Sequence, residues 1–431
     1  MAHAASRLVN AAEQLLGAPL PVRVRAWDGS QAGPPGAPVI VVRNRRALRR
    51  VLFKPGELGL ARAWVSGDLD IEGDLYTALG ALAGPLWEHD DDAEGRSLAR
   101  TLRDPAARAA VRELVRLVGP PLPPAPPREE IRRRRHLHTR RTDKRAISHH
   151  YDVGNDFYEL ILGPSMVYSC AYWEDGGSLE TAQRDKLGLV AAKLGLRPGQ
   201  RLLDVGCGWG SMAIHAAREH GVSVVGVTIS QEQAALARKR VAEEGLTDRV
   251  EIRVQDYRDV RDGPYDAISS IGMAEHVGAE RYLDYARDLY GLLKPGGRLL
   301  NHQIARRPRR DETEYEVDAF IDSYVFPDGE LAPVGTTVTQ LERAGFEVRD
   351  VESLREHYAR TLRSWVTNLE GDWERAMRLA GPGRARVWRL YMAASALAFE
   401  RNQIGVNQVL AVRTPESGTS GLPARTRTWN T

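Results

Sequence analysis

The clearest chemical signal in this chain is the segment 202–210, LLDVGCGWG. Its apolar start predicts a buried parallel strand that ends near Asp204. Gly206, Gly208 and Gly210 then let the backbone turn sharply and approach a ligand closely. A glycine-rich turn from a strand into a helix aims backbone N–H groups at a bound molecule. The segment therefore predicts a nucleotide-cofactor site.

The spacing of these glycines narrows the choice of cofactor. Gly-x-Gly-x-Gly lacks the third glycine that a pyrophosphate-binding turn uses. It resembles instead the first motif of methyltransferases that use S-adenosylmethionine (SAM). SAM carries no phosphate, and the Asp204 carboxylate at the strand end can serve its ammonium group. The alternative is a purely structural turn.

Two later strand ends supply further cofactor candidates. Thr228, with Gln233 one turn later, can hydrogen-bond the ribose hydroxyls where many methyltransferases carry an acidic residue. The same segment also fits a helix N-cap at Ser230, and both interpretations can hold together. Tyr257 and Arg258 follow the third strand, where an adenine is expected to lie. Their alternative is an ordinary surface turn.

Four motifs in order identify a resemblance to one family. They are HYDVGNDFY at 150–158, YSCAYW at 168–173, GCGWG at 206–210 and GMAEHVG at 272–278. With them the chain resembles the cyclopropane-fatty-acyl-phospholipid synthases, a family that includes the mycolic acid cyclopropane synthases. The resemblance covers about residues 145–412, and the N-terminal region resembles the extra domain of longer bacterial members.

The resemblance implies a SAM-dependent C-methyltransferase that acts on the cis double bond of an unsaturated phospholipid acyl chain. Methyl transfer to an alkene generates a carbocation, and a base must remove a proton from the new methyl group so that a cyclopropane ring can close. In the family this base is thought to be a bound bicarbonate, which needs hydrogen-bond donors around it. The matching positions are Cys170, Glu275, His302, Ile304 through its backbone, and Tyr358. Tyr168 and Ser169 are assigned to the cofactor.

Each of these residues also has a structural interpretation. Cys170 can be a small buried apolar residue, which is the commoner fate of a free cysteine. Glu275 can cap a helix, His302 can be a hydrogen-bonded core histidine, and Tyr358 can belong to one face of an amphipathic helix. At the level of the whole protein the alternatives are a methylene-branched product from the same methyl transfer, and a lipid-binding relative without catalysis.

Aromatic side chains near these motifs are candidates to line the acyl pocket and steady the cation. The candidates are Tyr168, Tyr172, Trp173 and Tyr324. The chain also departs from the family pattern at two positions. Ala274 stands where many members have Phe, and Ser395 stands where a second cysteine is often found, so a cysteine nucleophile at that point is excluded.

The fold class follows from the rhythm of strands and helices. Apolar strands are predicted at 201–205, 222–229, 250–255, 265–271 and 297–304, with helices between them. This alternation predicts an α/β fold, a Rossmann-like class I SAM methyltransferase domain with a helical cover. Residues 1–90 predict a smaller mixed domain, with a helix at 8–16, strands at 22–27 and 39–42, and a basic helix at 44–52.

The length of 431 residues favours two domains. The predicted boundaries are an N-terminal accessory domain at 1–118 for membrane or dimer contacts, a linker rich in proline and arginine at 119–144, a catalytic domain at 145–413 and a disordered tail at 414–431. Proline cannot continue a helix or a sheet interior, which places the linker at GPPLPPAPP.

The charge balance is nearly even, with 60 Lys and Arg against 57 Asp and Glu, but arginines come in runs. The runs at 45–50, 132–135 and 306–310 predict docking to anionic lipid headgroups, with solvated faces or nucleic acid as the alternatives. The absence of a nucleic-acid recognition motif disfavours the last. Two cysteines, no membrane-spanning run and no signal sequence predict a cytoplasmic protein, peripheral to the inner face of the membrane, with a homodimer as an option and no metal.

Overall fold

The computed structural model describes residues 3–87, 104–119, 122–131, 153–312, 317–327 and 329–423. The chain divides into two compact units, and neither is continuous in sequence. The first unit contains Met1–Arg132, Ala319–Val325 and Gly381–Leu397. The second contains Arg133–Asp318, Phe326–Ala380 and Ala398–Thr431. Two segments from within the predicted catalytic domain therefore pack with the N-terminal residues.

The second unit is built on a seven-stranded sheet with the order β10–β11–β9–β8–β5–β6–β7. The strands from β7 to β9 are parallel, whereas β11 is antiparallel to both of its neighbours. The strands are β5 (Arg201–Val205), β6 (Ser223–Thr228), β7 (Val250–Val254), β8 (Tyr265–Ile271), β9 (Leu293–Arg306), β10 (Glu347–Ser353) and β11 (Ile404–Val412).

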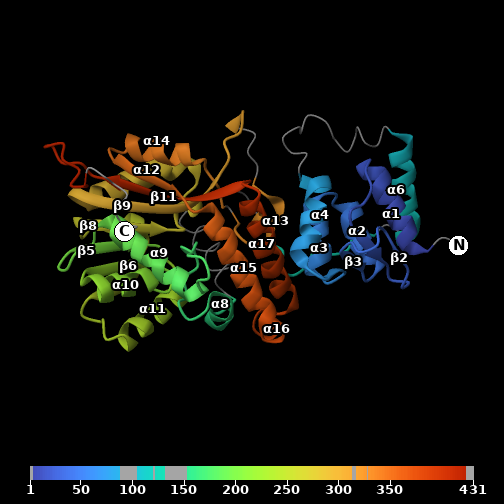
Figure 1. Ribbon diagram of the computed structural model, residues 1–431, viewed down its shortest axis with the longest axis horizontal. Coiled ribbons are helices and arrows are strands. Elements are labelled where there is room, and N and C mark those ends of the chain that lie inside the picture. The colour runs from blue at the N-terminus through green and yellow to red at the C-terminus, as the bar shows by residue number, and fades with distance from the viewer. Residues whose placement is uncertain are drawn as a thin grey trace. The chain divides into compact units, whose positions relative to one another are not determined.

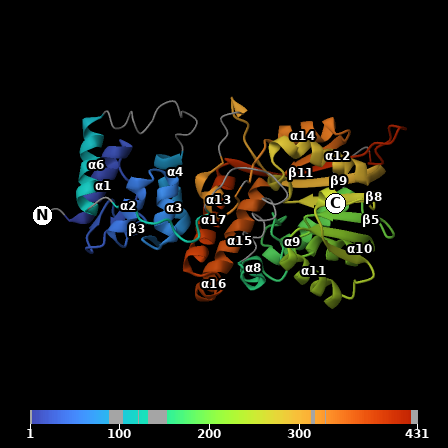
Figure 2. The ribbon, with the colours of Figure 1, turned by 180° about the vertical axis from the view of Figure 1, so that it is seen from behind.

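Helices cover both faces of this sheet, as Figures 1 and 2 show from opposite sides. Helices α9 (Leu179–Leu194), α10 (Ser211–His220) and α11 (Gln231–Glu243) bury apolar side chains with one face. Helices α12 (Tyr282–Leu292) and α14 (Val334–Arg343) do so with the other. The rest of the helical cover consists of α8 (Asn155–Leu162), α15 (Arg355–Gly371) and α16 (Trp373–Ala380). The predicted Rossmann-like α/β class with a helical cover is confirmed.

The five predicted strands are found close to their expected bounds because each is an apolar run buried between two helical layers. The end of the chain differs from the expectation. Leu422 packs against the core, and the Arg298 guanidinium donates a hydrogen bond to the Gly421 carbonyl at 2.9 Å. The predicted tail is therefore packed as far as Leu422, and 424–431 lie outside the described residues.

The first unit contains a four-stranded sheet with the order β2–β1–β3–β4. Its strands are β1 (Arg23–Arg25), β2 (Gln31–Ala32), β3 (Val39–Val42) and β4 (Leu69–Glu72). Its helices are α1 (Ala4–Leu16), α2 (Arg45–Phe53), α3 (Glu57–Val65), α4 (Leu75–Trp87), α6 (Pro105–Val118), α13 (Ala319–Tyr324) and most of α17 (Pro382–Glu400). The helix and the two strands predicted before residue 43 are confirmed, as is the basic helix after them.

Polar contacts attach α17 to the first unit. The Arg386 guanidinium lies 4.3 Å from the centre of the Trp64 ring and donates to the carbonyls of Trp64 and Leu69, both at 2.6 Å. The Trp64 indole N–H donates back to the Arg386 carbonyl at 2.8 Å. Because the hydrogen bonds run in both directions, the helix is held in one register against α3.

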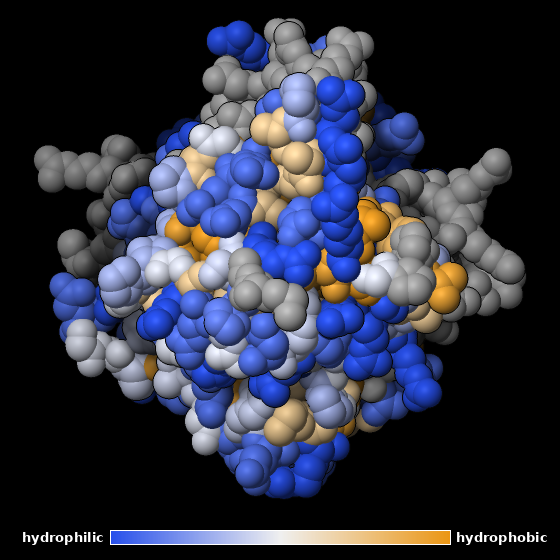
Figure 3. All heavy atoms as spheres, turned by 90° about the vertical axis from the view of Figure 1, so that its right-hand side faces the viewer, coloured by the Kyte–Doolittle hydropathy of each residue, from blue (hydrophilic) through white to orange (hydrophobic). Residues whose placement is uncertain are grey.

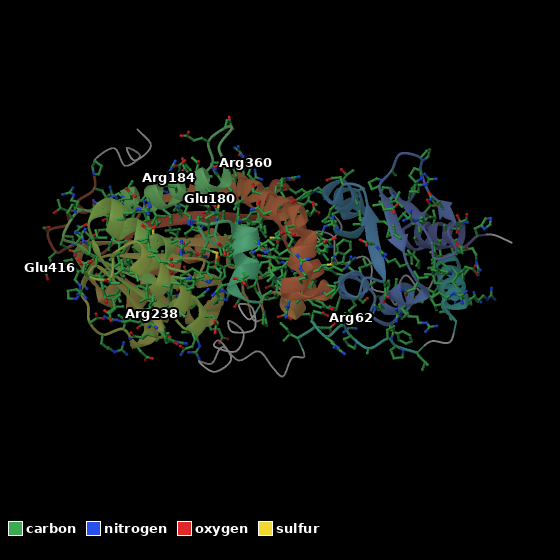
Figure 4. All side chains as sticks on the ribbon, turned by 90° about the horizontal axis from the view of Figure 1, so that it is seen from below. Arg62, Glu180, Arg184, Arg238, Arg360 and Glu416 are labelled. Carbon is green, nitrogen blue, oxygen red and sulfur yellow. The ribbon has the colours of Figure 1, made fainter. Side chains whose placement is uncertain are left out.

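A partly buried ion pair holds α13 in the same unit. Arg62, labelled in Figure 4, donates two hydrogen bonds to the Glu130 carboxylate at 2.6 and 2.7 Å. The Tyr324 hydroxyl donates a third to Glu130 at 2.9 Å. These charge-assisted bonds satisfy a carboxylate that would otherwise be costly to bury.

Candidate active site

The predicted site residues follow the carboxyl ends of the parallel strands. Asp204 and the glycine turn end β5, Thr228 ends β6, Tyr257 follows β7, Glu275 follows β8, and His302 lies on β9. Parallel strands bring these ends to one edge of the sheet, which is where ligands bind in open α/β folds. The fold therefore collects residues that are up to about a hundred positions apart in sequence.

The glycine turn has the backbone that a cofactor cradle requires. Gly206, Gly208 and Gly210 have φ of +74°, +54° and +81°, a region that other residues rarely adopt. A Cβ atom added at Gly208 would meet no atom within 4 Å, so the space beside the turn is open. The N–H groups of Gly206 and Cys207 both donate to the Val227 carbonyl at 3.0 Å. The turn is thereby attached to the end of β6.

Asp204 offers an unpaired oxygen at the end of β5. The residue is 2% exposed, and its Oδ1 accepts a hydrogen bond from the Ser269 hydroxyl at 2.7 Å. Its Oδ2 is buried and has no hydrogen-bond partner. Burial raises the pKa of this carboxyl to about 6, although the Ser269 hydrogen bond and Lys186 oppose the shift. A cationic group beside Oδ2 would restore the ionised form, so the ammonium of SAM fits here.

Thr228 and Gln233 bind each other at the end of β6. The Thr228 hydroxyl donates to Gln233 Oε1 at 2.8 Å, and the Ser230 hydroxyl accepts from the Gln233 N–H at 3.2 Å. The helix N-cap interpretation is therefore confirmed. Both side chains remain at the carboxyl edge, and their contact with a ribose stays a proposal.

Tyr257 and Arg258 lie after β7 in a short turn of 3-10 helix, Tyr257–Asp259. The Tyr257 ring is buried and meets the Tyr285 ring edge-on, with 5.5 Å between ring centres. The Arg258 guanidinium forms two hydrogen bonds to the Asp256 carboxylate at 2.8 and 2.6 Å. These contacts show that both residues have structural roles, and their assignment to the adenine remains a proposal.

Glu275 lies in the 3-10 turn after β8, Ala274–His276. Its Oε1 accepts the Ile304 backbone N–H at 2.8 Å, so this N–H is already used within the protein. Its Oε2 is buried and has no hydrogen-bond partner. Burial raises the pKa of the Glu275 carboxyl to about 7, against the opposing Ile304 hydrogen bond. Near neutral pH the carboxyl is therefore protonated in part of the molecules, and it can either donate or accept a hydrogen bond.

His302 is 2% exposed and pairs with Gln408 across the strands β9 and β11. The Gln408 side-chain nitrogen lies 3.3 Å from His302 Nδ1. When this amide donates, Nδ1 is the acceptor and the ring proton is on Nε2. Nε2 is buried without a partner, and burial lowers the pKa of the ring well below its usual value. His302 is thus a neutral donor, and nothing among the described residues receives its hydrogen bond.

Cys170 and Tyr358 reach the same neighbourhood through the start of α15. The Cys170 thiol lies 3.6 Å from the Leu354 carbonyl, and the Leu354 N–H donates to Val406, the cross-strand neighbour of Ile304. Tyr358 follows one helical turn later, since its N–H donates to Leu354. Burial raises the pKa of the Cys170 thiol, so it is a neutral thiol and not a nucleophilic thiolate.

Aromatic rings surround the predicted site residues Tyr168 and Tyr358. Trp365 lies between them, with ring centres 5.4 Å from Tyr168 and 6.0 Å from Tyr358. Phe399 lies 4.7 Å from Tyr358, and Tyr158 lies 5.8 Å from Tyr168. Trp365 and Phe399 were not predicted, although their place in apolar helices was visible.

The other predicted lining residues have different contacts. Tyr172 stacks on His357 at 4.8 Å, and the Trp173 indole N–H donates to Thr361. Arg360, labelled in Figure 4, lies 5.2 Å from the centre of the Trp173 ring. Tyr324 belongs to the first unit, where it binds Glu130, so we do not include it in the site.

Sequence reasoning missed Lys186 and Gln183, two buried polar residues of α9 behind Ser169. Gln183 donates to the Ser169 carbonyl at 3.0 Å, and Lys186 donates to the Ser169 hydroxyl at 2.9 Å. A signal was present, because both residues fall on the helix face that carries Leu187 and Val190. Cys207 lies in the core.

Two searches of the described ranges bear on metals and membranes. None of the described helices is long and apolar enough to cross a bilayer. No cluster of three or more His, Cys, Asp or Glu side chains within those ranges is arranged to hold a metal ion.

Comparison with known proteins identifies the class. The sequence pattern of the family described as mycolic acid cyclopropane synthetase matches residues 138–409. The probable fatty acid methyltransferase Rv3720 of Mycobacterium tuberculosis is 45% identical over 419 residues, 94% of each chain. The cyclopropane-fatty-acyl-phospholipid synthase of Escherichia coli is 40% identical over 269 residues, 62% of this chain and 68% of that protein.

A solved structure supports the cofactor. The mycolic acid cyclopropane synthase CmaA1, complexed with S-adenosylhomocysteine (SAH) and CTAB, aligns with 62% of this chain and 98% of its own at 33% identity and a TM-score of 0.59. The fold and the site define a SAM-dependent methyltransferase that acts on lipids. The chain belongs to the mycolic acid cyclopropane synthetase family.

Proposed function

We propose that this enzyme transfers a methyl group from SAM to the cis double bond of an unsaturated phospholipid acyl chain and closes a cyclopropane ring. The observation that carries the proposal is a pair of buried polar atoms, Glu275 Oε2 and His302 Nε2, that have no partner in the part of the chain that the structure describes. Such atoms cost about 1–3 kcal/mol each unless a ligand satisfies them. A small oxyanion that acts as a base satisfies both, and ring closure requires a base.

The residues have three roles, namely to bind the cofactor, to line the acyl pocket and to hold the oxyanion. The glycine turn and Asp204 bind SAM, with Tyr168, Ser169, Thr228, Gln233, Tyr257 and Arg258 as further contacts. SAM supplies an electrophilic methyl group on a positively charged sulfur. The Trp365, Tyr168 and Tyr358 rings exclude water and present π-faces toward positive charge on the acyl chain.

Cys170, Glu275, His302 and Tyr358 hold the oxyanion, which we propose to be bicarbonate, and the Ile304 backbone N–H contributes by positioning Glu275. Bicarbonate would supply the base that accepts the proton from the new methyl group. His302 donates from Nε2, and Glu275 shares a proton because its pKa lies near neutrality. The two electrons of the broken C–H bond then form the last bond of the ring.

A second product has a specific observation in its favour. The name of the relative at 45% identity says fatty acid methyltransferase, and the match covers nearly the whole chain. Methyl transfer followed by loss of a different proton would give a methylene-branched chain from the same site. We place this product second because it needs the same base and adds a hydride shift.

The decisive experiment incubates the purified protein with SAM and liposomes of a cis-monounsaturated phospholipid. Mass spectrometry should find acyl chains heavier by one CH₂, and NMR should find cyclopropane ring protons. Exocyclic methylene signals would replace the first product by the second. Binding of SAH without any change in the lipid would overturn the catalytic proposal and favour a lipid-binding relative.

We also propose a cytoplasmic enzyme that docks peripherally on the membrane and forms a homodimer. The arginine runs contribute less to docking than the sequence indicates. Arg49 and Arg50 donate to the carbonyls of Val118 and Ala125, and Arg306 donates to the Leu331 carbonyl. Hydrophilic residues predominate on the face in Figure 3, and apolar residues there form small separate patches. The run at 132–135 lies outside the described residues.

Docking and dimerisation have direct tests. Substituting Arg132 to Arg135 with serine should weaken sedimentation with anionic vesicles, and unchanged sedimentation would remove that run from the proposal. Light scattering of the purified chain should give twice the monomer mass, and a monomer at micromolar concentration would remove the dimer.

A further inference from the structure

Helix α9 carries two buried lysines, and only one of them forms an ion pair among the described residues. Lys193 is fully buried and forms ion pairs with Glu352 and, at 3.5 Å, with Asp350. Lys186 lies two turns earlier and is 1% exposed. Among the described residues it has no carboxylate within salt-bridge distance, and its hydrogen bond goes to the Ser169 hydroxyl at 2.9 Å. Asp204 attracts this ammonium electrostatically without forming an ion pair with it, and a buried ammonium with no ion-pair partner is costly, so Lys186 calls for an explanation.

A structural role in holding the segment 167–170 in place does not explain why residue 186 carries a charge. The Ser169 carbonyl is already bound by Gln183 at 3.0 Å, and Gln183 also reaches the Val167 carbonyl at 3.4 Å. A neutral side chain at 186 would leave this attachment intact and would avoid the desolvation penalty. The ammonium therefore serves something other than the backbone of the segment 167–170.

Ser169 stands between Lys186 and the site. Lys186 donates to the serine oxygen, which leaves the hydroxyl proton available to a ligand. A hydroxyl polarised in this way by a cation is a strong donor to an anion. The next residue is Cys170, and Lys186 acts electrostatically on Cys170 and on Asp204.

We propose that Lys186 and Ser169 form a subsite for a small carboxylate-type anion, with Lys186 as the positioning residue and Ser169 as the group that touches the ligand. Two ligands of the site have this chemistry, namely the amino-acid carboxylate of SAM and bicarbonate. The proposal rests on the use of SAM, which the family shows, and is independent of the lipid product.

The test compares Lys186→Met with the matched control Lys193→Met. Calorimetry measures the binding of SAH and of 5′-methylthioadenosine, which lacks the amino-acid carboxylate. If the subsite holds the cofactor carboxylate, Lys186→Met lowers the affinity for SAH by about tenfold to a hundredfold and leaves the affinity for 5′-methylthioadenosine unchanged. If it holds bicarbonate, SAH affinity is unchanged and the half-saturating bicarbonate concentration rises by a similar factor.

Other outcomes overturn the proposal. It fails if Lys186→Met changes neither the affinity for SAH nor the half-saturating concentration of bicarbonate. It also fails if the substitution lowers the affinity for 5′-methylthioadenosine as much as that for SAH, which would indicate general damage to the site. Lys193→Met should lower the melting temperature and leave the SAH affinity within about twofold, because its charge is matched within the protein. If Lys186→Met does not fold, Ser169→Ala replaces it and should show the same pattern.

The pH dependence gives a readout that a structural role would not change. Cys170 and Asp204 act electrostatically on Lys186, which in turn acts on His215 and His302, and burial lowers the pKa of Lys186 to about 8. If the subsite holds the cofactor carboxylate, the affinity of the unmodified enzyme for SAH should decline above about pH 8, because the Lys186 ammonium loses its proton. The decline should be absent in Lys186→Met. The same decline in both proteins would exclude Lys186 as its source.

Discussion

Strand β9 carries buried polar side chains on both of its faces, and the two sets differ in how fully they are hydrogen-bonded. Asn301 and Gln303 point to one face. Gln303 Oε1 accepts from the Tyr282 hydroxyl and the Asn301 amide, both at 2.7 Å, and Gln303 donates to Thr337 at 2.7 Å. This network is closed within the protein.

His302 lies between them and points to the other face. Its Nε2 has no partner, and neither has Glu275 Oε2 near the end of the same strand. The difference teaches that burial alone does not distinguish a structural polar group from a functional one. A closed network stabilises the fold, whereas open buried positions indicate a ligand.

We call the region of His302 and Glu275 the open side and the region of Asn301 and Gln303 the closed side. The largest expected effect is on the open side. Glu275→Gln should reduce turnover by about 10²- to 10⁴-fold, because the oxyanion loses a group that shares its proton. SAH affinity should stay within about twofold, since Asp204 and the glycine turn are untouched. Stopped assays of SAH release and calorimetry measure the two quantities. Glu280→Gln, at an exposed position five residues later, is the control and should leave both unchanged.

The same substitution should change how stability depends on pH. The pKa of the Glu275 carboxyl is about 7 in the folded protein against an ordinary value of 4.5, so the unfolded chain loses this proton first as pH rises. The stability of the wild type should therefore fall between about pH 4.5 and 7, by about 3 kcal/mol in total. Glu275→Gln should lack this loss. Urea unfolding at pH 5 and pH 8 measures the free energy of unfolding of both proteins. The same change between the two pH values in both proteins would contradict a raised pKa of the Glu275 carboxyl.

On the closed side, Gln303→Leu should destabilise the protein by about 2–3 kcal/mol. The substitution leaves the Tyr282 hydroxyl and the Asn301 amide buried without their acceptor. Folded protein should still bind SAH with normal affinity. Gln340→Leu on α14 is the control, and it should change the unfolding free energy by less than about 0.5 kcal/mol. A loss of SAH binding without a loss of stability would reverse the assignment of the two faces.

The smallest effect is expected at Gln408, which orients the open side. Gln408→Leu removes the hydrogen bond to His302 Nδ1 and lets the ring proton move between the nitrogens. Turnover should fall by roughly tenfold, with little change in SAH affinity. NMR of the His302 ring nitrogens should show one tautomer in the wild type and a mixture in the variant. A mixture in both would contradict the role of Gln408.

The sequence was sufficient for the sheet and for most of the open side. The apolar residues of β5 to β9 and the turns after them could be predicted locally, whereas Glu275 and His302 were assigned from the family resemblance. The closed side was not predicted, because an Asn or a Gln in a strand does not show which partners lie on the facing helices. Gln408 was not predicted as a partner of His302, because the pairing of β11 with β9 cannot be read from the sequence.

The composition of the two units could not be read from the sequence either. Arg386 and Trp64 lie 322 positions apart, and their contacts bring most of α17 to the first unit. Periodicity in α17 shows that a face is apolar but not what covers it. Lys186 was overlooked for a related reason, since a lysine in a helix is usually solvated and only tertiary structure shows that it is buried.

The measurement that tests the open side most directly is the dependence of turnover on bicarbonate. SAH release is followed with SAM and unsaturated liposomes in buffer purged of carbon dioxide, and bicarbonate is then added back. The account predicts that the rate falls by about tenfold or more on depletion and returns on addition, and that Glu275→Gln is not rescued. A wild-type rate that is the same with and without bicarbonate would contradict the assignment of Glu275 and His302 to an oxyanion site.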